Sequence, residues 1–211
     1  HWITFDSDGG TYVEPMFVHA NDTAEAPVSP EKAGYKFKNW KLNGETFNFE
    51  SPITTDITLT AEWEAVTVSY TVIHWYENAN DENYSYYMLE TKYGLAGEQT
   101  EAKALRESTR GTNIFGETVR ENVFTAQSFN QEEIKGDGST IVNIYYSRKE
   151  YTLTFKEPGW NGRTLKTIQA KYGAAIDWPS YAYSRRGGYR IVDDPDDGTS
   201  LWVLNQSGTR Y

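Results

Sequence analysis

Hydrophobic and polar residues alternate along much of the chain. The alternation is clearest in one short stretch, where Ile57, Leu59, Ala61 and Trp63 fall on one face and threonines and a glutamate fall on the other. A period of two residues is typical of a strand that buries one face. The pattern therefore predicts a protein built mostly of half-buried strands.

A turn signal lies just before this strand. Asn43-Gly44 separates an aromatic run from Phe47 and Phe49. Both turn residues tolerate positive φ, so the pair predicts a tight hairpin. The large side chains of this stretch are the expected core anchors of the N-terminal segment, namely Tyr35, Phe37, Trp40 and Trp63.

Three segments of the chain open in a similar way. Each has an alternating strand followed by turn residues, at Ile3–Phe5, Tyr70–Trp75 and Tyr151–Phe155. A second strand is expected after each opening, and self-similarity of this kind indicates repeated units. We predict three small modules in tandem, residues 1–65, 66–149 and 150–211, the third of them incomplete or divergent.

One stretch favours a helix rather than a strand. In residues 98–107, Thr100 has the chemistry of an N-cap, and Ala102, Ala104 and Leu105 follow it. With this short helix the predicted fold class is mostly β, of the α+β type.

Composition excludes several kinds of partner. The formal net charge is −10, which argues against nucleic acid and against an anionic membrane surface. There is no cysteine, so a disulfide framework and a Cys-based zinc site are excluded. No apolar run approaches the length of a membrane span, and no signal peptide is recognisable. We expect an internal fragment of a longer protein.

The sequence offers little material for catalysis or for metal binding. His1, His19 and His74 lie in different segments and are expected at strand surfaces or at the terminus. Asp6-Ser-Asp8 is expected to form a turn rather than a calcium loop, and the acidic run at 193–197 a solvated loop. We find no nucleophile motif and no phosphate loop, so we expect no enzymatic activity, no cofactor and no metal.

Tyrosines on alternate positions leave two interpretations open. They pack against neighbouring strands, with Trp75 and Tyr145 as expected core anchors, or they stack on sugars. The residues of a possible ligand platform are Tyr84, Tyr86 and Tyr146. A Lys–Asn isopeptide crosslink is a further alternative that no motif requires.

Two longer stretches resemble known families. Residues 3–64 resemble an internalin B-type repeat, also called the Listeria–Bacteroides repeat, through ITFDSDGG, GYKFKNW and TLTAEW. One departure falls at Ala20-Asn21, where the family usually has an aromatic residue followed by Gly. Residues 68–148 resemble mucin-binding-protein-like modules through YTVIHWYEN and IKGDGSTIVNIYYSRK, and residues 150–211 resemble the start of another such module.

These resemblances imply a β-grasp, ubiquitin-like fold and an extracellular place in a large repetitive protein of the bacterial cell surface, attached to the cell wall or secreted. The expected function is a non-enzymatic stalk, an adhesion module that binds host or matrix glycoprotein, or both. The alternative is a set of carbohydrate-binding accessory modules of a secreted multidomain enzyme. Fold similarity by itself assigns no ligand.

Overall fold

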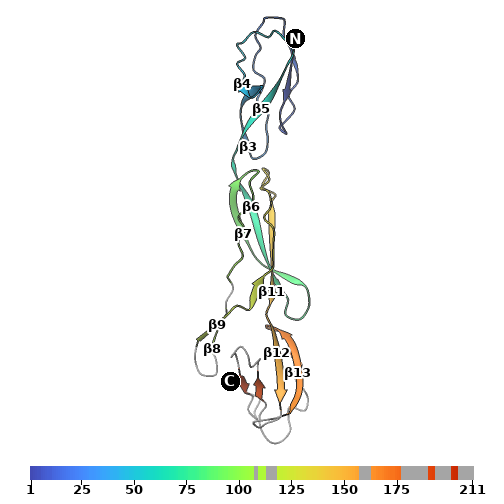
Figure 1. Cartoon of the computed structure of the whole chain (residues 1–211), viewed down its shortest axis with the longest axis vertical. Coiled ribbons are helices and arrows are strands. Elements are labelled where there is room, and N and C mark those ends of the chain that lie inside the picture. The colour runs from blue at the N-terminus through green and yellow to red at the C-terminus, as the bar shows by residue number, and fades with distance from the viewer. Residues whose placement is uncertain (107–108, 113–117, 157–162, 177–189, 193–200, 204–211) are drawn as a thin grey trace. The chain divides into compact units, whose positions relative to one another are not determined.

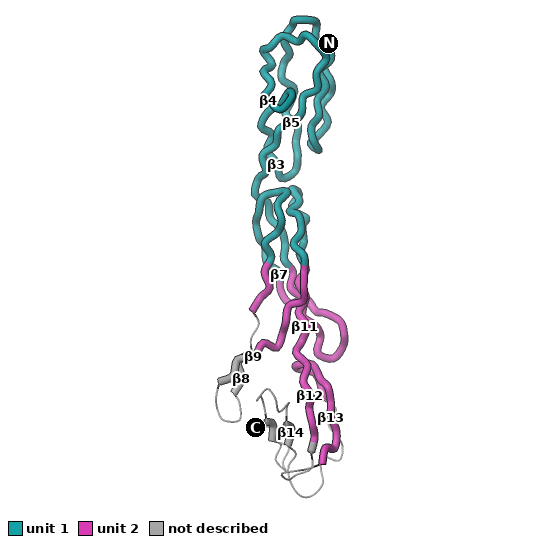
Figure 2. Tube along the Cα trace, in the orientation of Figure 1, with its two compact units in different colours: residues 1–72, 89–102, 130–142 teal, residues 73–88, 103–129, 143–211 magenta. Residues whose placement is uncertain are grey.

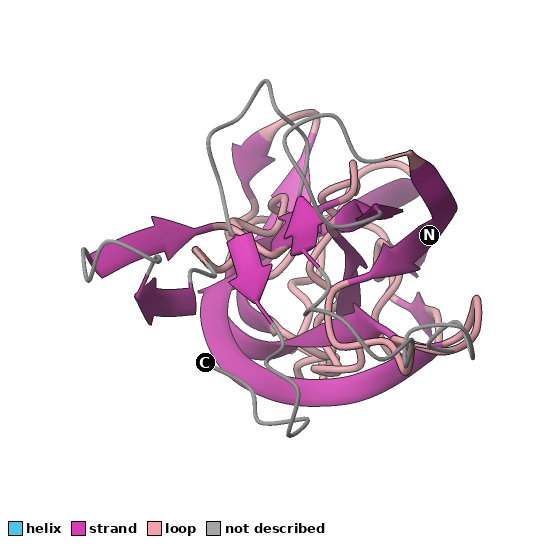
Figure 3. Cartoon of the chain, turned by 90° about the horizontal axis from the view of Figure 1, so that it is seen from below, coloured by secondary structure: helices cyan, strands magenta, loops and turns pink. Residues whose placement is uncertain are grey.

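The computed structural model describes the chain with six gaps. The described residues are 1–106, 109–112, 118–156, 163–176, 190–192 and 201–203. They form strands, turns and loops, and no helix is present among them (Figures 1 and 3). The expectation of a mostly β protein with several sheets is confirmed.

The first sheet is built by the N-terminal segment. Its strand order is β2-β1-β5-β3-β4. Strands β1 and β5 pair in parallel at the centre, and the other pairs are antiparallel. The strands are β1 (Trp2–Asp6), β2 (Met16–Phe17), β3 (Tyr35–Leu42), β4 (Glu45–Thr46) and β5 (Ile57–Ala65).

Strands β3 and β4 form the predicted hairpin. Leu42 pairs with Glu45 across the turn. Asn43 and Gly44 have φ angles of 51° and 89°, the left-handed conformation that a two-residue type I′ turn requires. The prediction of a hairpin at Asn43-Gly44 is therefore confirmed.

The core of the first sheet follows the alternation read from the sequence. Leu59 and Ala61 on β5 are buried, and Ile57 and Trp63 on the same face pack partly buried against the cluster. Trp40 lies 4.8 Å from Phe5, measured between ring centroids. The fully buried members of the cluster are Ile3, Val18, Trp40, Ile53, Leu59 and Ala61.

The departure at Ala20-Asn21 is accommodated by asparagine itself. Asn21 has a φ of 70°, in the region that glycine usually occupies. Asparagine tolerates this conformation better than other side chains do. The amide of Asn21 donates to the carbonyl of Ile53, and that of Asp22 donates to the carbonyl of His19. A turn therefore forms here without the glycine.

The second sheet has the order β10-β11-β6-β7. One of its faces is buried, through Val72 and His74 on β6 and through Val142, Ile144 and Tyr146 on β11. Its strands are β6 (Thr67–Glu77), β7 (Tyr84–Leu95), β10 (Phe124–Ala126) and β11 (Ile141–Arg148).

The helix expected at 98–107 does not form in the described part of that stretch. The Thr100 hydroxyl donates to the side chain of Gln131 and accepts a bond from the amide of Glu132, so it does not cap a helix. Ala102 also exchanges two hydrogen bonds with Gln131. These partners lie far along the chain and satisfy the backbone groups that a helix would otherwise pair.

The third sheet has the order β13-β12-β14-β15, and its described strand pairs are antiparallel. Phe155 on β12 is buried. The strands are β12 (Glu150–Lys156), β13 (Thr164–Lys171), β14 (Arg190–Val192) and β15 (Leu201–Val203). A separate hairpin joins β8 (Thr109–Thr112) to β9 (Thr118–Glu121).

The chain divides into two compact units (Figure 2). Unit 1 contains residues 1–72, 89–102 and 130–142, and unit 2 contains residues 73–88, 103–129 and 143–211. The module boundaries expected at 65/66 and 149/150 stay a prediction.

Within unit 1, two glycines bring distant parts of the chain into backbone contact. A Cβ atom built on Gly136 would lie 1.7 Å from the carbonyl oxygen of Ala33, and one built on Gly34 would lie 2.3 Å from the Cα of Gly136. Only glycine fits at either position.

Candidate ligand-binding surface

Four aromatic side chains gather on one face of the second sheet, and we call them the aromatic platform. They are Trp75 on β6, Tyr84 and Tyr86 on β7, and Tyr145 on β11. The Trp75 and Tyr145 rings are nearly parallel, with centroids 6.2 Å apart. Tyr86 lies 6.1 Å from Trp75, and Tyr84 lies 5.0 Å from Tyr145, both in edge-on geometry. Each ring therefore supports a neighbour, and the set forms one continuous surface.

Strand alternation explains how the platform arises. On β11, Val142, Ile144 and Tyr146 point into the core, so Asn143 and Tyr145 point outward. Tyr86 is 56% exposed and Tyr145 is 39% exposed, whereas Trp75 and Tyr84 are half-buried. The platform thus combines solvent access with rings that are held in place.

Neutral polar groups border the platform. The indole Nε1 of Trp75 donates to Oδ1 of Asn143 at 2.8 Å. The Nε2 group of Gln127 donates to the Tyr84 hydroxyl and to Oγ of Ser147, the latter at 2.9 Å. These bonds fix the orientation of Trp75 and Tyr84.

The opposite face of this sheet contains a buried polar pair. Nδ1 of His74 lies 2.8 Å from the Tyr146 hydroxyl, and that hydroxyl accepts a bond from the amide of Leu105 at 2.7 Å. Both side chains are fully buried. A buried hydroxyl needs such partners, because an unsatisfied polar group in a core costs free energy.

This geometry corrects three expectations. Tyr146 was expected on an exposed surface but is buried, whereas Tyr145 was expected to be a core anchor but lies on the exposed face. The reason is the two-residue period of β11, which sends adjacent tyrosines to opposite faces. His74 was expected at a strand surface, but it lies in the core because it shares a face of β6 with Val72.

The other expected residues lie as follows. Tyr84 and Tyr86 are together on the platform, with Trp75, which was expected to be a core anchor. Trp40 is 3% exposed, and Tyr35, Phe37 and Trp63 are partly buried. The remaining histidines are peripheral. His1 contacts Asp56 at 3.3 Å, and His19 is exposed.

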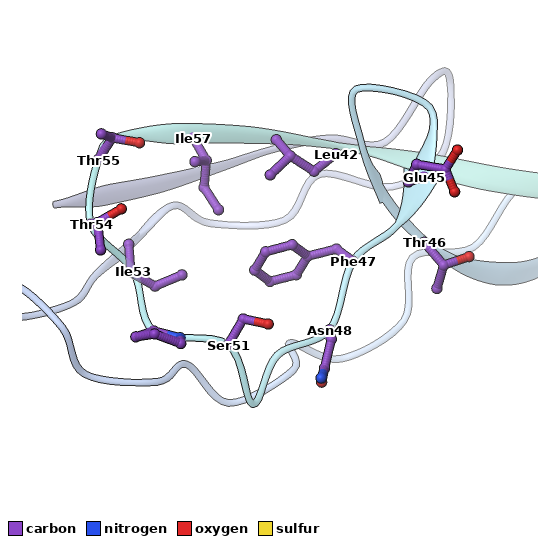
Figure 4. A pocket seen from close by; sticks show the side chains of 11 residues that line it. Leu42, Glu45, Thr46, Phe47, Asn48, Ser51, Ile53, Thr54, Thr55 and Ile57 are labelled. Carbon is purple, nitrogen blue, oxygen red and sulfur yellow. The ribbon is translucent and has the colours of Figure 1, made fainter.

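A concave surface lies in the N-terminal segment (Figure 4). It is an open groove of about 400 Å³ beside β4. Phe47, Ile53 and Ile57 provide apolar walls, and hydroxyl groups of Thr54 and Thr55 lie at its edge. Glu45 is the one carboxylate among its lining residues. The groove therefore lacks the pair of acids that glycoside hydrolysis uses.

Charged side chains of unit 2 are organised around Lys171. Its Nζ lies 2.9 Å from carboxylate oxygens of both Glu77 and Glu82. Hydrogen bonds to Glu82 and Glu77 raise the pKa of Lys171, against the effect of burial. Burial by itself would raise the pKa of Glu77, but the bonds from Lys171 and from the Arg148 amide outweigh it and hold the pKa below its usual value. The cluster joins the β6–β7 connection to the end of β13, which is a structural role.

We find no cluster of metal-ligating side chains in the described residues. No group of three or more His, Asp or Glu side chains there is placed to hold a metal ion. Asp6 accepts the amide of Asp8, so this acidic pair forms the expected turn. The acidic run at 193–197 lies outside the described residues.

Comparison with known proteins gives two relatives from Evansella cellulosilytica. One is a putative membrane protein, 29% identical over 184 residues, which cover 84% of this chain and 25% of that protein. The other is a putative Gly-rich membrane protein, 38% identical over 74 residues, 32% of this chain and 9% of that protein. The chain thus spans a quarter or less of the relatives it matches.

The described residues contain no helix with the length and apolar character needed to cross a membrane.

The N-terminal segment is matched by a family model. One sheet contains strand β1, which is followed by Asp-Gly-Gly, the Gly-Tyr-x-Phe-x-x-Trp strand β3 and the closing strand β5. Residues 1–62 match the family model of the Listeria-Bacteroides repeat domain.

Proposed function

We propose that this chain is a non-enzymatic repeat segment of a bacterial cell-surface protein, acting as a stalk and as an adhesion module that binds host or matrix glycoprotein. The observation that carries the adhesive part is the aromatic platform. Exposed Tyr and Trp side chains combine large apolar area with a polar group, and such residues concentrate at binding surfaces.

The comparisons support the location. A bacterial repeat family matches residues 1–62, and the two relatives are described as putative membrane proteins that are far longer than this chain. A segment of such a protein would lie outside the cell, attached to the wall or secreted, with neighbouring modules of the same polypeptide on either side.

The proposal includes a finer assignment of the modules. The order β2-β1-β5-β3-β4 with a central parallel pair supports a β-grasp-like arrangement for residues 1–65, of the internalin B type. Residues 66–149 form a mucin-binding-protein-like module, and the aromatic platform lies within this stretch.

Binding to an immobilised mucin, before and after enzymatic removal of its glycans, tests the function. Wild-type chain should bind the intact mucin, and the double variant Tyr86→Ala/Tyr145→Ala should bind at least about tenfold more weakly, because both rings are exposed. Tyr93→Ala is the matched control, since Tyr93 is a 71% exposed tyrosine of β7 outside the platform. Wild-type binding that is absent, or equal in the double variant, contradicts the proposal.

The same platform would also suit a carbohydrate-binding accessory module of a secreted enzyme. The two functions differ in what flanks this segment in the parent protein. A wall-sorting signal supports the surface adhesin, whereas a catalytic domain supports the accessory module.

A further inference from the structure

Three rings of the aromatic platform form a row across neighbouring strands. Tyr145 lies on β11, Trp75 on β6 and Tyr86 on β7, and the strands are adjacent in this order. The ring centroids follow one another at 6.2 Å and 6.1 Å. This spacing is comparable to the length of one pyranose unit. A linear sugar chain can therefore place successive units against successive rings.

The side chains that hydrogen-bond to the platform rings are uncharged. Asn143 uses its Oδ1 to accept the Trp75 indole, and its NH2 group has no protein partner among the described residues. The hydroxyls of Tyr86 and Tyr145 are likewise without a protein partner in that part of the chain. Amides and hydroxyls both donate and accept, which matches the hydroxyl groups of a sugar.

The charged side chains beside Tyr86 already have protein partners. Arg148 and Asp81 line an open hollow with Tyr86. The Arg148 guanidinium donates to the carbonyl oxygens of Glu77 and Tyr172, and the Asp81 carboxylate accepts from Asn78 and Asn83. In the described residues, cations lie over the rings of other aromatics, such as Arg148 over Phe124 at 4.8 Å, but none lies over a platform ring. A sialic acid carboxylate or a sulfate needs charge-assisted donors to offset its loss of water. The chain also carries a formal charge of −10, which repels anions at longer range.

We infer that the aromatic platform binds uncharged linear oligosaccharides, that it needs three consecutive pyranose units for full affinity, and that it rejects sialylated or sulfated chains. This inference rests on the proposed adhesive function and adds the chemical class of its ligand. A peptide partner is disfavoured because the charged side chains beside the platform, Arg148 and Asp81, already have protein partners and are not available to fix its register.

Titration calorimetry with the whole chain tests this. The probes are neutral β-1,4-linked glucose and N-acetylglucosamine oligomers, from monosaccharide to hexasaccharide, and a sialylated oligosaccharide of matched length. Affinity should rise from the monosaccharide to the trisaccharide and then level off. The sialylated probe should bind at least about tenfold more weakly than its neutral counterpart, because its carboxylate meets no compensating cation.

Variants locate the site. Tyr86→Ala should lower trisaccharide affinity by about tenfold, Tyr86→Phe should retain most of it, and Tyr93→Ala should change nothing. Melting curves of each variant confirm that the fold is kept. The inference is wrong if the sialylated probe binds equally well, if affinity does not depend on chain length, or if Tyr93→Ala weakens binding as much as Tyr86→Ala.

The outcomes also separate this inference from the proposed function. A chain that binds mucin only through its protein core, or through sialylated glycans, overturns the inference and leaves adhesion standing. Absence of binding to mucin and to every oligosaccharide overturns both. Binding to neutral oligosaccharides without binding to mucin supports the inference and moves the function to the accessory-module alternative.

Discussion

Replacing Trp40 by alanine tests the core of the N-terminal segment. The indole is 3% exposed and its ring lies 4.8 Å from Phe5 and 5.4 Å from Phe37, measured between centroids. Removing a buried aromatic side chain costs about 3–5 kcal/mol, through lost transfer energy and through the cavity that remains. The whole free energy of unfolding of a typical domain is about 5–15 kcal/mol.

One feature moves the expected cost toward the lower end of that range. The Nε1 group of Trp40 is buried without a hydrogen-bond partner among the described residues. A buried unsatisfied donor costs about 1–3 kcal/mol, and the substitution relieves this cost. We therefore expect Trp40→Ala to lose about 3 kcal/mol. Trp40→Phe keeps a ring and discards the donor, so it should lose less than about 1.5 kcal/mol.

Urea unfolding gives the loss of stability, and hydrogen exchange shows where it acts. Protection should fall in residues 1–72 and also in 89–102 and 130–142, because the backbones of Gly34 and Gly136 touch. Protection loss confined to residues 1–65 would instead support the module boundary expected from the sequence. An unchanged unfolding curve combined with lost ligand binding would refute the reasoning, since Trp40 would then act as an exposed contact residue.

Three further predictions follow from close contacts. Gly136→Ala should lower the free energy of unfolding by about 3 kcal/mol or more, because the new Cβ atom would overlap backbone atoms. In Gly44→Ala the new Cβ atom meets no atom within 4 Å, so this control should cost only about 1 kcal/mol, from the positive φ. Equal costs of the two variants in thermal unfolding would contradict this. Glu77→Gln should destabilise the chain at neutral pH, because a carboxyl with a lowered pKa stabilises the fold only while it is ionised. The difference should begin to shrink as the pH falls below the ordinary pKa of 4.5 and should be lost once the carboxyl of the folded chain is protonated; a pH-independent difference in urea midpoints would disprove it. Tyr146→Phe should cost about 1–3 kcal/mol, because the buried His74 and the amide of Leu105 each lose the hydrogen bond to this hydroxyl. A neutral effect on the melting curve would show that water replaces the hydroxyl.

Local patterns predicted the first sheet well. The alternation from Ile57 to Trp63 and the turn at Asn43-Gly44 are both properties of neighbouring residues, and both appear in the structure. Thr100 was misread because its partner, Gln131, lies thirty-one residues away and is invisible to a local pattern.

The platform was only half predictable. Tyr84 and Tyr86 were found through their spacing on one strand. The choice between Tyr145 and Tyr146 depended on the phase of the alternation, and that phase was readable from Asn143, whose polarity marks the outward face. The meeting of Trp75 with Asn143 comes from strand pairing across sixty-eight residues and has no local signal.

The contact between Gly34 and Gly136 has a consequence for how such proteins evolve. Repeat proteins diversify by recombination, in which one unit is exchanged for another. Here neither glycine tolerates a side chain while the other stretch is in place. A transferred copy of residues 1–65 would keep this close backbone contact only when the segment that follows it in the new protein also has a glycine at the position equivalent to Gly136. Gly34 and Gly136 should therefore be inherited together, and exchange by recombination should favour blocks that carry both.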